Sequence, residues 1–272
     1  MIKKRLLSFV LCLLFVFSCI GVQAFAAAET GYDEMITDII DRCTAADNAS
    51  ENAQQQQANG AYALAQLFAV IAAEKAEVQE VLDTVTKIMD DMSKSDNTCR
   101  DAKDQLVNGV YSCVELLSVI AQEFDTDGSN RELIGEIMDY TTAGDARAED
   151  VDQQAVVGLY RCVDLLTVIV IENSDSDEEA QEAEQINASL KTGDDACQNS
   201  LQQRVNGACR IFELLQFLSV QLDEDNSWAE TRDAIWDSYE QGDNIATDVE
   251  IQLANSLYRC VEMTSVIARQ LA

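Results

Sequence analysis

The sequence repeats every 49 residues, and this period restricts the chain to a fold that is built by stacking copies of one unit. Five segments similar to ANGAYALAQLFAVIA begin at positions 58, 107, 156, 205 and 254, with no insertion between them. Gln56 and Asp47 recur unchanged at the equivalent positions of all five units. The units run at about 27–75, 76–124, 125–173, 174–222 and 223–272. We therefore expect a single repeat domain over residues 27–272.

Each unit has the apolar spacing of two helices and no stretch that alternates for long enough to suggest a strand. Proline, the residue that most strongly interrupts a helix, is absent from the whole chain. A shorter first helix is predicted to stop at a small residue followed by Asp, which we interpret as the N-cap of a longer second helix. In the first unit this second helix is expected over about residues 48–74. The five expected caps are Asp47, Asp96, Asp145, Asp194 and Asp243.

The long helix is apolar or small over more than half of its circumference, so several neighbours must cover it. Stacked helical hairpins provide this cover, because each unit buries its apolar face against the units before and after it. The predicted fold is all-α, an α-solenoid of five helical-hairpin repeats with ten helices. It resembles HEAT-type stacks in general form, but it lacks proline and the tetratricopeptide pattern with its period of about 34 residues. A closed helical bundle is the alternative.

Residues 1–26 differ from the repeats. Two lysines and an arginine precede the apolar run LLSFVLCLLFVFSCI, which is followed by a small-residue site at AFA. This pattern indicates a secretory signal peptide that is cleaved before Ala27, so we expect a secreted protein. A retained membrane anchor is a lesser alternative, because the run is shorter than the roughly 20 residues of a spanning helix. Lipid attachment through Cys19 is another, disfavoured by the bulky Phe17.

Composition excludes several kinds of chemistry. The chain has no histidine, so Ser/His and Cys/His catalysis and His-ligated zinc are excluded. Its 49 acidic and 18 basic residues give a formal charge of -31, which becomes -34 once the three basic residues of the signal are removed. This charge repels nucleic acid and anionic membranes and favours a basic partner. Carboxylates are abundant, but no unique constellation breaks the repeat symmetry, so we expect no enzyme and no cofactor.

The polar face of the long helix repeats an Asn, a Tyr and an acid that lie within an arc of about 60 degrees. Stacking would turn these groups into a ladder that suits an extended or cationic peptide, because amides pair with a peptide backbone and aromatic rings and carboxylates attract Lys and Arg. The candidate ligand-binding residues are Asn59, Tyr62, Asn108, Tyr111, Glu115, Tyr160, Asp164, Asn206, Glu213, Asn255, Tyr258 and Glu262.

The same residues have a structural interpretation. An arginine three residues before three of these acids predicts intrahelical ion pairs on a solvated face. The Gln56 column, at the edge of that face, is expected to hydrogen-bond helix ends or loops between units. The mid-helix glycines that begin with Gly60 are expected at close helix contacts, which compensate for the low helix propensity of glycine.

Calcium is a second possible ligand. Acids near the ends of the short helices and the starts of the long ones lie close in sequence to the Asp47 column. Together they offer oxygen-rich clusters for weak Ca²⁺ binding. Helix capping alone also explains the invariant Asp47 column. The acidic turns that begin at Asp125 and Asp223 look like calcium loops but fail the EF-hand pattern, with Gly128 at the fourth place. We therefore predict no specific metal site.

Seven cysteines remain after the signal, and they follow the repeat rather than a disulfide plan. Cys113, Cys162 and Cys260 share one apolar column in which Leu64 and Ile211 occupy the other units. Equivalent positions in successive units are expected to lie beyond the roughly 7 Å limit for a disulfide. We therefore expect reduced thiols that pack as small apolar side chains.

These observations predict an exported, non-enzymatic and monomeric binding scaffold for a basic peptide or protein partner. The alternative is an acidic structural or weakly calcium-binding surface protein without a specific macromolecular ligand.

Overall fold

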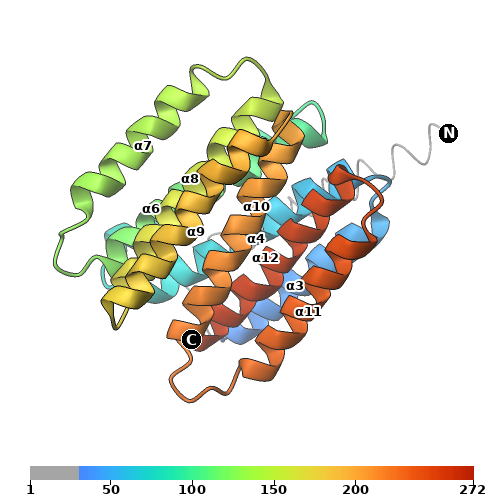
Figure 1. The fold of residues 1–272 in the computed structure, drawn as a ribbon. Coiled ribbons are helices and arrows are strands. Elements are labelled where there is room, and N and C mark those ends of the chain that lie inside the picture. The colour runs from blue at the N-terminus through green and yellow to red at the C-terminus, as the bar shows by residue number, and fades with distance from the viewer. Residues whose placement is uncertain (1–30) are drawn as a thin grey trace.

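The computed structural model describes residues 31–272, and this part of the chain consists of helices without strands. Each unit supplies a shorter outer helix followed by an inner one (Figure 1). The outer helices are α3 (Tyr32–Ala49), α5 (Gln79–Asp96), α7 (Arg131–Asp145), α9 (Asp177–Ala196) and α11 (Ala229–Ile245). The inner helices are α4 (Ala53–Lys75), α6 (Ala102–Phe124), α8 (Val151–Glu172), α10 (Ser200–Gln221) and α12 (Val249–Leu271). The predicted all-α class is confirmed, and the expected signal peptide lies outside the described residues.

Each inner helix begins at an Asn or Asp whose side chain accepts a hydrogen bond from a backbone N–H two or three residues ahead. These caps are Asn52, Asp101, Asp150, Asn199 and Asp248. The prediction that the Asp47 column caps these helices was wrong. Asp47 and its equivalents belong to the last turns of the outer helices, and α4 begins at Ala53 rather than near residue 48. In the second, third and fourth units the side chain of this column accepts a hydrogen bond from a tyrosine of the preceding unit instead.

The five inner helices close into a ring, since α12 packs against α4 as each inner helix packs against the one before it. A Cβ atom on Gly109 would lie 2.9 Å from the Cβ of Ala61 in α4, and one on Gly60 would lie 3.1 Å from the Cβ of Leu257 in α12. At the same seam, Gln57 Nε2 donates to the backbone oxygen of Glu250 at 2.9 Å. The ten helices of residues 31–272 therefore form a closed ring, nearer to the bundle alternative than to an open-ended stack.

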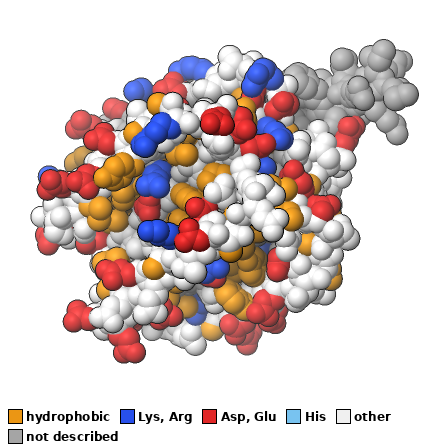
Figure 2. Space-filling model, turned by 45° about the horizontal axis from the view of Figure 1, so that its top comes forward, with side chains coloured by type: hydrophobic (Ala, Val, Ile, Leu, Met, Phe, Trp, Pro, Cys, Tyr) orange, Lys and Arg blue, Asp and Glu red, His pale blue; other side chains and the backbone are white. Residues whose placement is uncertain are grey.

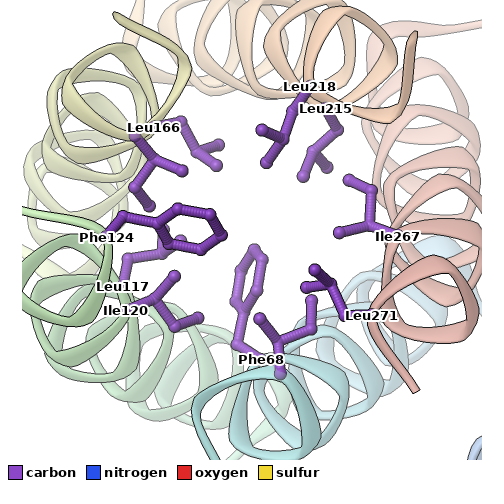
Figure 3. A pocket seen from close by; sticks show the side chains of 11 residues that line it. Phe68, Leu117, Ile120, Phe124, Leu166, Leu215, Leu218, Ile267 and Leu271 are labelled. Carbon is purple, nitrogen blue, oxygen red and sulfur yellow. The ribbon is translucent and has the colours of Figure 1, made fainter. Parts of the chain in front are cut away.

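The ring is filled by apolar side chains from all its inner helices. In α4 every residue from Gln57 to Ala73 is buried, in agreement with a helix that is apolar or small over more than half of its circumference and is covered by several neighbours. At the axis, near the C-terminal ends of the inner helices, Phe68, Leu117 and Ile267 point toward one another (Figure 3). The core is thus continuous around the ring and has no free end.

Each outer helix covers the groove between the inner helix of its own unit and the preceding inner helix. The first outer helix, α3, packs on α4 and also on α12, so the outer layer continues across the seam. Acidic side chains are spread over the face shown in Figure 2, with Lys and Arg side chains between them. On this face the negative charge is therefore spread out rather than gathered in one patch.

Candidate functional site

A surface groove of about 360 Å³ runs over α6, between the end of α5 and the end of α7. Two of its lining residues, Asn108 and Tyr111, belong to the predicted polar ladder. Carboxylates of Asp104 and Asp145 lie beside them, and neither Lys nor Arg lines the groove. Its other lining residues are Ser95, Thr98, Cys99, Val107 and Gln154. A volume of this size is at the lower end of the range for small-ligand sites, about 300–1,000 Å³.

Local sequence fixes the floor of the groove. Asp101 caps α6 by accepting from the backbone N–H groups of Lys103 and Asp104 at 3.0 and 3.2 Å. Arg100, at the edge, contacts both carboxylate oxygens of Asp104 at 2.7 and 2.8 Å. This contact lowers the pKa of Asp104 below its ordinary value, first through the hydrogen bond from Arg100. Asp104 therefore stays ionised at neutral pH.

Most of the predicted tyrosines connect neighbouring units. Each donates its hydroxyl to the Asp of the following outer helix, and we call this contact, with the amides around it, the Tyr–Asp clasp. The distances from Oη to Oδ1 are 2.7 Å for Tyr62 and Asp96, 3.0 Å for Tyr111 and Asp145, and 2.6 Å for Tyr160 and Asp194. At the seam, Tyr258 shares a hydrogen bond of 2.9 Å with Thr44 instead.

Amide groups complete each clasp. Gln105 Nε2 donates to Asp96 Oδ1 at 2.9 Å, and the equivalent bonds recur in the later units for Gln154, Gln203 and Gln252. The predicted role of this column at helix ends is confirmed. The predicted asparagines also anchor outer helices: Asn108, Asn206 and Asn255 donate to backbone oxygens 16 residues earlier, and Asn59 donates to Ser50 Oγ. In the third unit Val157 replaces this asparagine.

Burial divides the predicted ladder. Tyr62 and Asn59 are only 2% and 5% exposed, so a ligand cannot reach them without opening the ring. Tyr111, Asn108, Tyr160, Asn206, Asn255 and Tyr258 are partly exposed at their junctions. Within the ladder, only Asn108 and Tyr111 line the groove over α6. The ladder is therefore interrupted. Its accessible groups come together in a groove at one junction, the one over α6.

The acidic column behaves mainly as the structural interpretation predicts. Asp164, Glu213 and Glu262 each form an ion pair with the arginine three residues before them, at 2.7 Å for Asp164 and 2.6 Å for Glu213. Glu115 has Ser112 at the position of that arginine and is exposed. Since Glu115 follows Tyr111 by one turn of α6, it extends the acidic character of the floor beyond the groove.

The groove is polar but has no activated nucleophile. Burial, followed by the charges of Asp96 and Asp104, raises the pKa of the Cys99 thiol to about 11. The pKa of Tyr111 is also raised, by burial and by its hydrogen bond to Asp145. Both groups are therefore protonated near neutral pH, whereas nucleophilic thiols have lowered pKa values. The arrangement suits recognition of a positive charge.

The other cysteines and the Asp47-column acids have structural roles. Cys113, Cys162 and Cys260 are buried against inner-ring helices, and burial raises the pKa of each thiol. All seven cysteines of the described residues are free, as predicted. Carboxylates of the Asp47 column, which the sequence offers for weak calcium binding, accept clasp hydrogen bonds, as at Asp96. Within residues 31–272, no three acidic or thiol side chains form a ready-made metal cage.

A second opening lies on the ring axis, where eleven apolar side chains from all five inner helices converge (Figure 3). Its free volume is only about 10 Å³. This is close to the space of one water molecule, and an apolar lining gives such a molecule no hydrogen-bond partner. The axial opening is therefore part of the core and too small for an organic ligand.

Sequence reasoning missed three features of the groove: Asp104, Asp145 as a lining carboxylate, and Cys99. For Asp145 the only signal was the invariance of its column, which capping explained equally well. No sequence signal distinguishes the junction that holds the groove over α6 from the other junctions. Whether a junction is open depends on the positions of the outer helices beside it.

Comparison with known proteins found no matching family model, no matching curated protein and no matching solved structure. Among the described helices, α8 alone is long and apolar enough to cross a membrane, and most of its most apolar stretch is buried inside the ring. The buried core helix of a closed ring meets the same criterion of length and apolar composition.

Proposed function

We propose that the protein is an exported, non-enzymatic scaffold that binds a basic peptide or protein segment in the groove over α6. The observation that carries the proposal is the groove itself, where Asn108 and Tyr111 stand beside the carboxylates of Asp104 and Asp145. A Lys or Arg side chain entering it would meet Asp145 and the edge or face of the Tyr111 ring, and would compete with Arg100 for the carboxylate of Asp104. Glu115, exposed one turn further along α6, would attract a second positive charge.

The overall charge supports a basic partner but does not locate the site. A formal charge of -31 for the whole chain attracts any cationic peptide weakly and at many places. If binding is specific to the groove, removing charges there must weaken peptide affinity more than removing the same number of charges elsewhere on the surface. The experiment is therefore built on matched pairs of variants.

The first test measures the anisotropy of a labelled oligolysine peptide with purified protein at low and high salt. The double variant Asp104→Asn, Glu115→Gln is compared with Asp233→Asn, Asp237→Asn, which removes two exposed charges from α11. Exposed charges are each worth up to about 1 kcal/mol, so we expect the groove variant to weaken binding about tenfold at low salt and the control to have little effect. Equal weakening by both pairs would show nonspecific attraction and refute the groove.

Two tyrosines provide a second matched pair. Tyr111 and Tyr160 make the same clasp at successive junctions, but only Tyr111 lines the groove. Both substitutions to Ala should lower the melting temperature by similar amounts. Only Tyr111→Ala should also lose oligolysine binding when both variants are assayed well below their melting temperatures; equal loss in the two variants would contradict the proposal.

A further inference from the structure

Two acidic turns occupy the same position in the third and fifth units and have the same backbone design. Asp125 accepts at Oδ1 from the backbone N–H of Asn130 at 3.1 Å, and Asp127 accepts from the backbone N–H of Ser129 at 2.8 Å. In the fifth unit, Asp223 and Asp225 each accept from the backbone N–H of Ser227 at 3.0 Å. Each turn also has one residue with positive φ, Gly128 at 77° and Asn226 at 58°.

In the fifth unit an arginine fills the turn. The Arg232 guanidinium forms an ion pair with Asp223 Oδ2 and donates to Asn226 Oδ1 at 3.2 Å. Both Arg232 and Asp223 are buried, so the acid is neutralised inside the protein. The neighbouring side chain from the end of α12 is the neutral Gln270, which donates to the backbone oxygen of Ser219 at 2.8 Å.

In the third unit the equivalent positions carry no such cation. Ile134 stands where the fifth unit has Arg232, and Glu172 stands where it has Gln270. Asp125 is only 2% exposed, and its Oδ2 atom is buried without a hydrogen-bond partner. A buried carboxylate oxygen without a partner is costly, and buried charges in proteins are usually paired or coordinate a metal.

Two further acidic side chains, Asp127 and Glu172, lie near Asp125. The pKa of Glu172 is raised, first by burial and then by the charges of Asp125 and Asp127. Glu172 also accepts a hydrogen bond from Asn130, which ties the end of α8 to the turn. Arg131 lies over Gly128, where a Cβ atom would be 3.2 Å from its Nε, but it is exposed and forms no ion pair with a described residue.

We propose that this turn is a divalent-cation site, suited to Ca²⁺, in which Asp125 Oδ2, Asp127 and Glu172 supply ligand oxygens where the fifth unit has the Arg232 guanidinium. Calcium tolerates irregular shells of carboxylate, carbonyl and water oxygens, so the turn does not need the EF-hand pattern. The three carboxylates do not yet surround one point. Binding therefore includes a rotation of the Glu172 side chain from Asn130 toward Asp125. This inference is independent of the groove over α6.

The test is isothermal titration of the full mature protein with CaCl₂, together with thermal unfolding in calcium and in chelator at constant ionic strength. We expect calcium at about a hundred times its Kd to raise the melting temperature by about 5 °C. The variant Glu172→Gln copies the fifth unit and should weaken binding about tenfold or more. Glu123→Gln removes the acid at the same position of the preceding unit and should bind calcium like the natural protein.

A second variant, Ile134→Arg, introduces the guanidinium of the fifth unit and should abolish the calcium effect if it folds. Ile134 is buried, so Ile134→Arg can fail to fold. In that case the calcium affinity of Glu172→Gln tests the proposal. Three results would overturn the proposal. The first is no calcium binding to the natural protein, and the second is equal binding to Glu172→Gln. The third is an equal rise in melting temperature with NaCl of the same ionic strength.

Discussion

The junction between α4 and α6 and the junction between α10 and α12 are built from the same repeat but are held differently. At the first, Tyr62 and Gln105 donate to Asp96, which is 5% exposed, so a complete clasp is buried. At the second, Cys209 replaces the tyrosine, and Asp243 is exposed with Gln252 as its hydrogen-bond donor.

Aromatic packing replaces the clasp at the second junction. The Tyr239 hydroxyl donates to Cys209 Sγ at 2.9 Å, and its ring stacks on Phe212 with centroids 4.4 Å apart. Trp236 stacks on the same Phe212 at 5.6 Å. One junction therefore depends on buried polar groups and the other on apolar area. Both junctions keep their inner helices equally close. Cys113 Sγ lies 3.6 Å from the backbone oxygen of Ala61 at the first, and Cys260 Sγ lies 3.7 Å from that of Ala208 at the second.

The largest difference is expected when the Asp of each clasp is removed. Asp96→Ala leaves the buried hydroxyl of Tyr62 and the amide of Gln105 without their acceptor, which should cost about 3 kcal/mol of unfolding free energy. Asp243→Ala removes an exposed acid with one partner and should change stability by no more than about 0.5 kcal/mol. Urea unfolding of both variants measures this, and equal losses would show that burial of the clasp is unimportant.

A smaller difference is expected at the helix contact itself. A Cβ atom on Gly109 would lie 2.9 Å from the Cβ and 3.1 Å from the carbonyl carbon of Ala61, so Gly109→Ala should separate α4 and α6 and cost about 1–3 kcal/mol. Ser256 holds the equivalent position in α12 and already has a Cβ. Ser256→Ala should cost only about 0.5 kcal/mol, with melting temperatures as the measurement. A gain in stability for Gly109→Ala, through its better helix propensity, would show that the contact is loose.

The smallest expected effect is a dependence on alkaline pH. The pKa of Tyr62 is raised above its ordinary value of 10, mainly by burial, so the folded protein keeps this proton after the unfolded chain has lost it. The stabilising contribution is complete below pH 10 and is lost as pH rises toward the raised value. Tyr62→Phe should therefore flatten the fall in stability above pH 10, whereas Tyr140→Phe, at a tyrosine that is 58% exposed, should not. Urea midpoints on both sides of pH 10 test this, and parallel curves for the three proteins would contradict it.

Local pattern predicted much of this structure. The helical class, the two-helix unit, the buried glycines, the free cysteines and the structural use of the Gln56 column all follow from spacing within one unit. The position of the caps did not follow, because both Asp47 and Asn52 are suitable cap residues, and only the structure shows that Asn52 begins the helix. For the groove, the sequence indicated Asn108 and Tyr111 but could not separate them from their equivalents at closed junctions.

The sequence by itself determined the period, the helices and the faces that must be buried, because each depends on residues within one or two turns of a helix. The tertiary structure decided that five units complete a circle, so that the last inner helix covers the first. Closure depends on the small rotation between successive units, which accumulates around the ring and is set by side-chain packing at every junction. The same packing decides which copy of a repeated residue is buried in a clasp and which one lines a groove.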